Sequence, residues 1–250
     1  MLKLRNNLTL NSHLRYLLWR TTGYRYNFTA QLMTGQHITI RRPPAQDIST
    51  ANEIFVQNVY QCPRQLDAKN VKTIVDVGAN VGYSCIYWLH QFPFSRVIAF
   101  EPHPIHIKQI KLHLQMNQLT ERVTLLASAA GTQSGEMFLT DMGPESTLLA
   151  TLNYNTLSVP VVDWFIEIGE EQIDLLKIDI EGSEYLLLAD TRFESLKIKT
   201  FVLEWHNTSD YPDGRTWCIE RLSQLGYSIV PGKVDKPPIG LLWAFRKDCL

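Results

Sequence analysis

The sequence predicts an α/β fold in which a mostly parallel sheet carries helices on both faces. Three observations lead to this class. Strand and helix patterns alternate from residue 73 onward, an order typical of parallel sheets covered by helices. The first predicted strand runs into a glycine turn and then a helix. The last two predicted strands have no helix between them, so they must pair antiparallel, because a parallel pair needs a longer crossover.

Length and composition limit the class of protein. A chain of 250 residues suits one large domain or one domain with a short extension. Lys and Arg total 24 and Asp and Glu total 25. Since duplex-binding proteins usually show a basic excess, no nucleic-acid partner is expected. The four cysteines form no CxxC pair, so neither a zinc ribbon nor a disulfide framework is expected, and a reducing cytoplasm fits best.

The domain organisation is predicted as an N-terminal extension, residues 1–60, packed on a core domain, residues 61–250, that carries a β insertion at 131–165. No signal peptide is recognised, and residues 8–19 are too short and too polar to span a bilayer. They are expected to form an amphipathic helix that packs on the domain. A peripheral membrane contact is the alternative, because Leu14, Leu17, Leu18 and Trp19 could form one apolar face.

The elements follow from local patterns. Residues 24–41 alternate around a Thr34-Gly35 turn and predict a hairpin, and residues 50–60 have apolar positions at helical spacing. Gly226 is placed to end the last helix. Short apolar runs predict strands at 73–77, 97–100, 123–126, 173–180, 200–205, 227–230 and 241–246, and helical spacing predicts helices at 84–92, 105–117, 183–189 and 215–225.

A nucleoside site is predicted at the ends of the first two strands of the core. Gly78 permits a tight turn after the first strand, and Gly82 permits a close approach of backbone to ligand. Glu101 ends the second strand, 23 residues after Gly78, where a carboxylate can accept hydrogen bonds from ribose hydroxyls. Asp76 lies just before the turn, where it would repel a diphosphate and suit a ligand that bears an ammonium group.

The turn differs from the dinucleotide fingerprint GxGxxG, because Asn80 stands where the second glycine would be. S-adenosylmethionine has a ribose, an ammonium group and no phosphate, so it fits these residues better than NAD. A dehydrogenase on the same sheet and a non-catalytic nucleoside-binding module remain as alternatives.

A second group of polar residues follows the fourth and fifth strands of the predicted sheet. Asp179, Glu181 and Glu184 come after the fourth strand, and Glu204 and His206 end the fifth. Methyl transfer to an alcohol oxygen is helped by a general base that removes the hydroxyl proton. His206 is best poised near neutral pH, with Glu204 expected to hold its imidazole, and Glu181 is the alternative base. Asp179 is placed near the methionyl ammonium. A metal hydrolase built on these residues would leave the nucleoside features unexplained, and no metal is predicted.

Several motifs resemble the FkbM family of S-adenosylmethionine-dependent methyltransferases: IVDVGANVGYSCIYW, VIAFEPHP, LLKIDIEGSEYLLL and FVLEWHN, over about residues 73–207. The resemblance implies the class I methyltransferase fold, Rossmann-like, with a seven-stranded sheet whose last strand is antiparallel. It also implies O-methylation of a sugar, glycolipid or natural-product hydroxyl, a small-molecule or glycan acceptor. The residues that match the cofactor site are Asp76, Gly78, Asn80, Gly82 and Glu101, with Ala129 in the stretch that meets the adenine.

Overall fold

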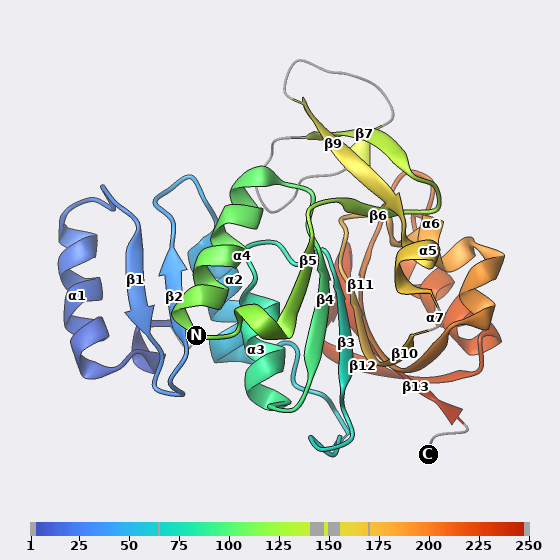
Figure 1. Cartoon of the computed structure of the whole chain (residues 1–250), viewed down its shortest axis with the longest axis horizontal. Coiled ribbons are helices and arrows are strands. Elements are labelled where there is room, and N and C mark those ends of the chain that lie inside the picture. The colour runs from blue at the N-terminus through green and yellow to red at the C-terminus, as the bar shows by residue number, and fades with distance from the viewer. Residues whose placement is uncertain (1–3, 65, 141–147, 150–155, 170, 248–250) are drawn as a thin grey trace.

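A seven-stranded sheet forms the centre of the computed structural model (Figure 1). The structure describes residues 4–64, 66–140, 148–149, 156–169 and 171–247. The strand order is β12-β13-β11-β10-β3-β4-β5, and the strands are β3 (Thr73–Val77), β4 (Arg96–Phe100), β5 (Val123–Leu126), β10 (Gln172–Ile178), β11 (Lys197–His206), β12 (Tyr227–Lys236) and β13 (Ile239–Arg246).

The sheet is mostly parallel and closes with an antiparallel hairpin, as predicted. Strands β5, β4, β3, β10 and β11 run parallel to one another. Strand β13 is antiparallel to both β11 and β12. Only residues 237–238 connect β12 to β13, too few for the crossover that a parallel pair requires.

Helices cover both faces of the sheet and make two separate cores. Because side chains alternate along a strand, Ile74 packs in one core and its neighbour Val75 packs in the other. The first core includes α3 (Tyr83–Gln91) and α4 (Pro104–Met116), and the second includes α5 (Trp164–Ile168), α6 (Glu184–Ala189) and α7 (Gly214–Gln224). No helix among the described residues is long and apolar enough to cross a membrane.

The N-terminal segment packs beside α4 on the first face (Figure 1). It contains α1 (Leu10–Thr21), the predicted hairpin of β1 (Phe28–Gln31) and β2 (His37–Ile40), and α2 (Asp47–Asn52), which continues into a π-helical turn, Glu53–Gln57. Buried hydrogen bonds attach β2 to the core. The Thr39 amide donates to Nε2 of His113, 2.8 Å away, and the Tyr83 hydroxyl donates to the Thr39 carbonyl.

The apolar residues of α1 divide between two faces, which corrects the single apolar face predicted for this helix. Trp19 is fully buried and stacks on Phe28. Leu14, Leu17 and Leu18 point the other way, and 59%, 39% and 62% of their surfaces are exposed. The indole occupies the inner face with Tyr16, because the hairpin offers an aromatic partner there.

Strands of the predicted insertion form a second sheet above the first (Figure 1). Its strands are β6 (Ala129–Gly131), β7 (Gly135–Thr140), β8 (Leu148–Leu149) and β9 (Thr156–Asp163), in the order β6-β9-β7-β8. Residues 141–147 and 150–155 of the predicted insertion lie outside the described residues, as does Cys249. Cys62, Cys85 and Cys218 are free thiols.

Candidate active site

A cavity lies where β3, β4 and β10 end, bordered on one side by the second sheet. The carboxyl edge of a parallel sheet is the usual place for a ligand in such folds. Apolar side chains and a few carboxylates share its wall. The residues that line it are Gly78, Asn80, Phe100, Glu101, Pro102, His103, His106, Ala129, Ala130, Leu139, Asp179, Ile180 and Glu181.

Glu101 is held in this wall by backbone amides. Its Oε2 accepts from the Asn80 amide at 2.8 Å, and its Oε1 accepts from the His103 amide at 2.9 Å. The imidazole of His106 lies 3.2 Å from the same Oε1. Each carboxylate oxygen has two lone pairs, so a fixed acceptor remains for hydroxyl groups of a ligand in the cavity.

The turn after β3 shapes the floor of the cavity. Gly78 has φ of 85°, and a Cβ there would overlap the backbone carbonyl of Asp179. Asn80 also has a left-handed backbone, with φ of 51°, which asparagine tolerates better than most residues. The turn therefore packs directly against the end of β10, and glycine at position 78 is required by that neighbouring strand.

Two predicted cofactor residues lie elsewhere than expected. Gly82 does not line the cavity. A Cβ on it would lie 3.1 Å from Ile110 of α4, so its lack of a side chain serves helix packing. Asp76 is fully buried behind the turn, with its Oδ1 3.2 Å from Nζ of Lys177. Its carboxylate is the counter-ion of a buried lysine, because both side chains point into the interior from adjacent strands.

Lys177 is the residue that sequence reasoning missed. Its Nζ lies 2.5 Å from the Gly78 carbonyl, to which it donates, and 3.4 Å from Oδ2 of Asp179. Burial opposes the charge, but Asp76 and Asp179 outweigh it and raise the pKa of Lys177 above its ordinary value. The lysine thus joins the turn to Asp179, which borders the cavity and receives a 3.4 Å hydrogen bond from the hydroxyl of Tyr60. The sequence feature that could have identified Lys177 is the position of a lysine inside the apolar run LLKI.

His206 lies among three carboxylates, as its place at the end of β11 suggested. Its Nδ1 is 3.1 Å from Oε1 of Glu184, which also accepts from the His206 amide. Its Nε2 is 3.3 Å from Glu181 and 3.8 Å from Glu204. Glu184 therefore holds the imidazole, which corrects the expectation that Glu204 does so. Glu184 is fully buried at the first turn of α6 and also accepts from the Gly182 amide.

The electrostatics of this group differ from those of an isolated histidine. Burial alone would lower the pKa of His206, but the hydrogen bond to Glu184 and the charges of Glu184, Asp179 and Glu181 raise it to about 9. Burial, followed by the charge of Asp179, raises the pKa of Glu204 well above its ordinary value. The imidazole is therefore mostly protonated at neutral pH before any ligand binds.

The same residues could hold a divalent cation. Asp179, Glu181 and His206 each offer a ligand atom, and these atoms lie within 4.8 Å of one another. Carboxylates and imidazole suit such ions. A cation would have to displace the proton of His206, because only the neutral imidazole binds metal.

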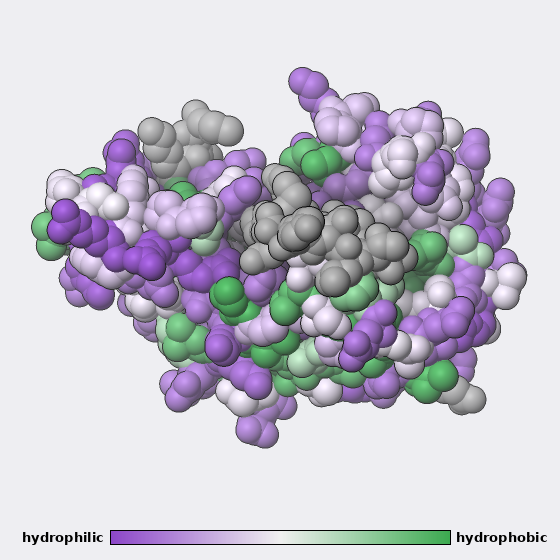
Figure 2. Space-filling model, turned by 90° about the horizontal axis from the view of Figure 1, so that it is seen from above, coloured by the Kyte–Doolittle hydropathy of each residue, from purple (hydrophilic) through white to green (hydrophobic). Residues whose placement is uncertain are grey.

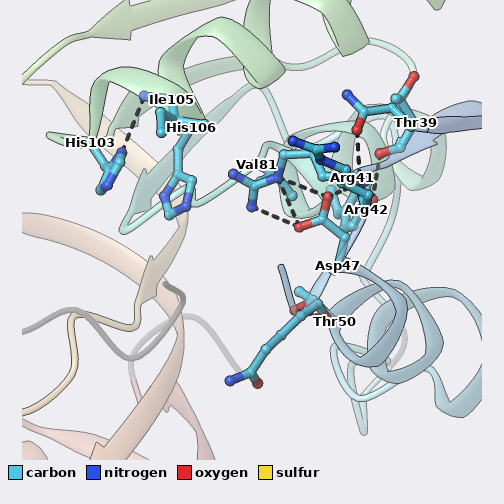
Figure 3. A network of polar contacts seen from close by, with 12 residues as sticks. Thr39, Arg41, Arg42, Asp47, Thr50, Val81, His103, Ile105 and His106 are labelled. Carbon is cyan, nitrogen blue, oxygen red and sulfur yellow. Dashed lines mark hydrogen bonds and ion pairs between the residues drawn. The ribbon is translucent and has the colours of Figure 1, made fainter. Parts of the chain in front are cut away.

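Two further histidines reach the cavity from the start of α4, and neither was predicted. His103 and His106 stack with ring centroids 4.5 Å apart. Nδ1 of His103 accepts from the Ile105 amide and begins the helix (Figure 3). Figure 3 also shows Asp47 facing Arg41, whose amide and guanidinium both donate to that carboxylate. This pair closes the turn between β2 and α2.

Comparison with known proteins identifies the family. A model of the methyltransferase FkbM domain matches residues 76–229, more than half of the chain. The protein belongs to the FkbM methyltransferase family. It is thus a methyltransferase, and its cofactor is S-adenosylmethionine. This assignment decides against the dehydrogenase and the non-catalytic module as alternatives.

Relatives of this FkbM methyltransferase are distant. Methyltransferase sdnD of Sordaria araneosa is 25% identical over 240 residues, covering 78% of this chain and 88% of that protein. Methyltransferase 1 of Beauveria bassiana (strain ARSEF 2860) is 26% identical over 158 residues, covering 53% and 62%. The crystal structure of methyltransferase FkbM from Methylobacillus flagellatus KT shares the fold with a TM-score of 0.53 at 19% identity. That alignment covers 73% of this chain and 45% of the other, so this chain spans less than half of that structure.

The cavity fits the cofactor. Phe100, Ala129 and Ala130 make part of the wall apolar, which would suit a purine, and Glu101 adds a carboxylate that would suit ribose hydroxyls. Next to Ala129 in the chain, the buried Oγ of Ser128 has no hydrogen-bond partner among the described residues. Asp179 and Glu181 supply negative charge at the opposite side of the cavity, where a cationic ligand is favoured.

Proposed function

We propose that this methyltransferase methylates a hydroxyl oxygen of a sugar, a glycolipid or another natural product. One observation carries the proposal. The imidazole of His206 is held at Nδ1 by the buried Glu184, and its Nε2 faces Glu181 at the cavity wall. His206 itself does not line the cavity, and Glu181 lies between its buried Nε2 and the cavity. A histidine held at one nitrogen by a carboxylate is the arrangement of a general base, which would act here once the acceptor reaches Nε2. A hydroxyl acceptor needs such a base because its proton must leave as the new bond forms.

S-adenosylmethionine supplies an electrophilic methyl group on a sulfonium. In our proposal Glu101 binds the ribose and Asp179 the methionyl ammonium, while the turn at Gly78 and Asn80 positions the nucleoside. Glu184 orients His206, whose Nε2 accepts the proton of the acceptor hydroxyl. Glu204 and Glu181 surround Nε2 and stabilise the imidazolium that results. The ligand positions for Asp76 and Gly82 are not retained, because neither residue lines the cavity.

The protonation state of His206 makes this proposal testable by pH. With a pKa of about 9, only about 1% of the imidazole is neutral at pH 7 in the free enzyme. Activity should then rise with pH up to about 9, rather than level off near the ordinary histidine pKa that sequence reasoning assumed. A cationic ligand beside Asp179 and Glu181 offsets part of the negative charge that raises this pKa. The acid limb in the pH profile of kcat should therefore lie at a lower pH than the acid limb in the profile of kcat/KM.

The experiment is a transfer assay with labelled cofactor and a panel of sugars, glycolipids and alcohol-bearing natural products, followed by mass spectrometry of the products. We expect an O-methyl ether, and we expect His206→Ala to lower kcat about a hundredfold or more. Methylation only at nitrogen or carbon would overturn the O-methylation proposal. Full activity of His206→Ala, with its acid limb unmoved, would leave Glu181 as the base.

We propose that the reaction needs no metal. The support is geometric, because both ring nitrogens of His206 already face carboxylates, Glu184 at 3.1 Å and Glu181 at 3.3 Å. Activity should therefore persist after dialysis against a chelator and should not rise when Mg²⁺ or Mn²⁺ is added. Loss of activity on chelation, restored by either ion, would instead assign Asp179, Glu181 and His206 as a cation site.

A further inference from the structure

The outer face of α1 is an apolar stripe with no partner in the described part of the chain. Leu10, Leu14, Leu17 and Leu18 are 77%, 59%, 39% and 62% exposed. At about 100° per residue, these four positions fall within an arc of about 100°, opposite the buried positions of Tyr16 and Trp19. Single exposed leucines are ordinary, but four on one face of a 12-residue helix form a continuous surface.

Basic residues border this stripe on both sides. On the helical wheel Arg15 lies on one edge of the leucines and Arg20 on the other. Both side chains are exposed and form no ion pair with a described residue. The end of the molecule that α1 forms in Figure 1 shows hydrophobic atoms beside strongly hydrophilic ones in Figure 2. Long basic side chains in such positions can keep their charges in the headgroup layer while their stems lie along the apolar surface.

The part of the N-terminal segment that precedes α2 has one sign of charge. Residues 1–46 contain seven Lys and Arg and no Asp or Glu, whereas the remaining residues contain 17 basic and 25 acidic side chains. The net charge of the chain is near zero because a cationic N-terminal stretch is balanced by the acidic remainder. Such a segment is attracted to an anionic surface.

We infer that α1 is an interfacial anchor that lays its leucine stripe into the headgroup region of an anionic bilayer. The helix is about 18 Å long, too short to span a hydrocarbon core of about 30 Å, and its apolar and basic residues are arranged as in helices that lie in the interface plane. A second copy of the chain fits less well, because pairing the stripes would bring two cationic segments together. Nucleic acid also fits less well, because leucines occupy the centre of the face where phosphate contacts would be needed.

The test is co-sedimentation of the full chain with vesicles. One set is phosphatidylcholine alone, and in the other about a third of the lipid is phosphatidylserine. We expect binding at least about tenfold tighter to the anionic vesicles, weakened by raising the salt from about 0.1 M to about 0.5 M. Equal binding to both sets, or binding to neither, would overturn the inference.

Two pairs of variants separate the stripe from its charges. Leu14→Gln with Leu18→Gln, and separately Arg15→Gln with Arg20→Gln, should each weaken vesicle binding by about tenfold or more. The matched controls are Ile166→Gln with Leu186→Gln, at positions 73% and 60% exposed on α5 and α6, and Lys197→Gln with Lys236→Gln at exposed sites of β11 and β12. These controls should bind as the natural sequence does.

All of these substitutions are on the surface, so melting temperatures should be unchanged and a loss of binding is not a loss of fold. Leucine variants that bind vesicles as tightly as their controls would overturn the insertion of the stripe. Sedimentation showing that the natural chain is a dimer and the leucine variants are monomers would overturn it in favour of a second copy. Neither result depends on the methyl acceptor, so the proposed function stands or fails separately.

Discussion

Glu101 illustrates how one side chain combines a structural and a ligand role. Its two oxygens hold the Asn80 and His103 amides, which tie the glycine turn to the start of α4. The residue also lines the cavity. The carboxylate is therefore fixed before the cofactor arrives, and little conformational freedom is lost on binding.

Replacing Glu101 by Ala should weaken cofactor binding about 10- to 150-fold, which corresponds to the roughly 1.5–3 kcal/mol of a hydrogen bond to a charged group. Titration calorimetry with S-adenosylhomocysteine measures the change. The control is Glu171→Ala, which removes an exposed carboxylate paired with the exposed Arg96. Unchanged affinity in a folded Glu101→Ala variant would exclude the ribose role.

Glu184 is a positioning residue, and its effect on His206 can be measured separately from its effect on folding. Replacing Glu184 by Gln keeps the shape but removes the nearest charge that raises the pKa of His206. We expect the acid limb of the pH–rate profile to move from about 9 toward the ordinary histidine value, together with a lower kcat.

Glu194→Gln is the matched control, because Glu194 is 59% exposed and pairs with Arg221 away from the cavity. Its profile should match that of the natural sequence. If Glu184→Gln lowers kcat but does not move the acid limb of the pH–rate profile, the titrating group is not His206.

At the scale of elements, the turn after β3 and the end of β10 form one unit. The Lys177 ammonium bonds the Gly78 carbonyl, and the Asp179 carbonyl occupies the space that a side chain on Gly78 would need. From the sequence, Gly78 was expected only to permit the tight turn after the first strand of the core. The overlap with β10 means that a side chain here damages the sheet as well as the cavity.

Gly78→Ala should therefore lower the free energy of unfolding by about 3 kcal/mol or more, since both a left-handed backbone and a steric overlap are involved. Gly226→Ala tests the backbone part alone, because Gly226 has φ of 88° and open space around it. That control should lose about 1–2 kcal/mol. If urea titrations gave equal losses in the free energy of unfolding for the two variants, β10 would have to move away from the new side chain without destabilising the protein.

At the scale of the whole molecule, a buried histidine joins the N-terminal segment to the core. Nε2 of His113 accepts from Thr39 of β2, so Nδ1 carries the proton and donates to the Val81 carbonyl at 2.7 Å. Burial, the largest cause, lowers the pKa of His113 below 6.5. A second proton on this ring would break the bond that attaches the hairpin.

Since the unfolded chain binds this proton more readily, His113 should make stability fall as the pH drops below about 6.5, by up to about 1.4 kcal/mol per pH unit. His206 contributes in the opposite direction at higher pH, because its raised pKa adds stability that is present below about 6.5 and lost as the pH rises through about 9. Urea titrations between pH 5 and pH 7.5 should show a shallower slope for His113→Gln than for the natural sequence. The same slope in both would exclude His113 as the group responsible.

Sequence alone was enough for the order of the elements, the class of the sheet and the edge at which the site lies. These depend on local information: apolar runs bounded by turns, a glycine turn between strand and helix, and a last connection without a helix that permits only an antiparallel pair. The positions of Glu101, Asp179, Glu181 and His206 followed from the rule that parallel strands end at one edge, and the structure places three of these four in the cavity wall.

Only the tertiary structure decided which charges meet. Asp76 turned inward to Lys177 because an adjacent strand offered a buried ammonium, and Glu184 rather than Glu204 took Nδ1 of His206 because α6 brings its first turn against the end of β11. The pKa of His206 depends on three carboxylates of the segment 179–184, which lies against the end of β11, and the direction of Trp19 on α1 depends on a hairpin that follows it. Each of these outcomes is a contact between residues distant in the chain, and local spacing does not determine which partner fills the space beside a side chain.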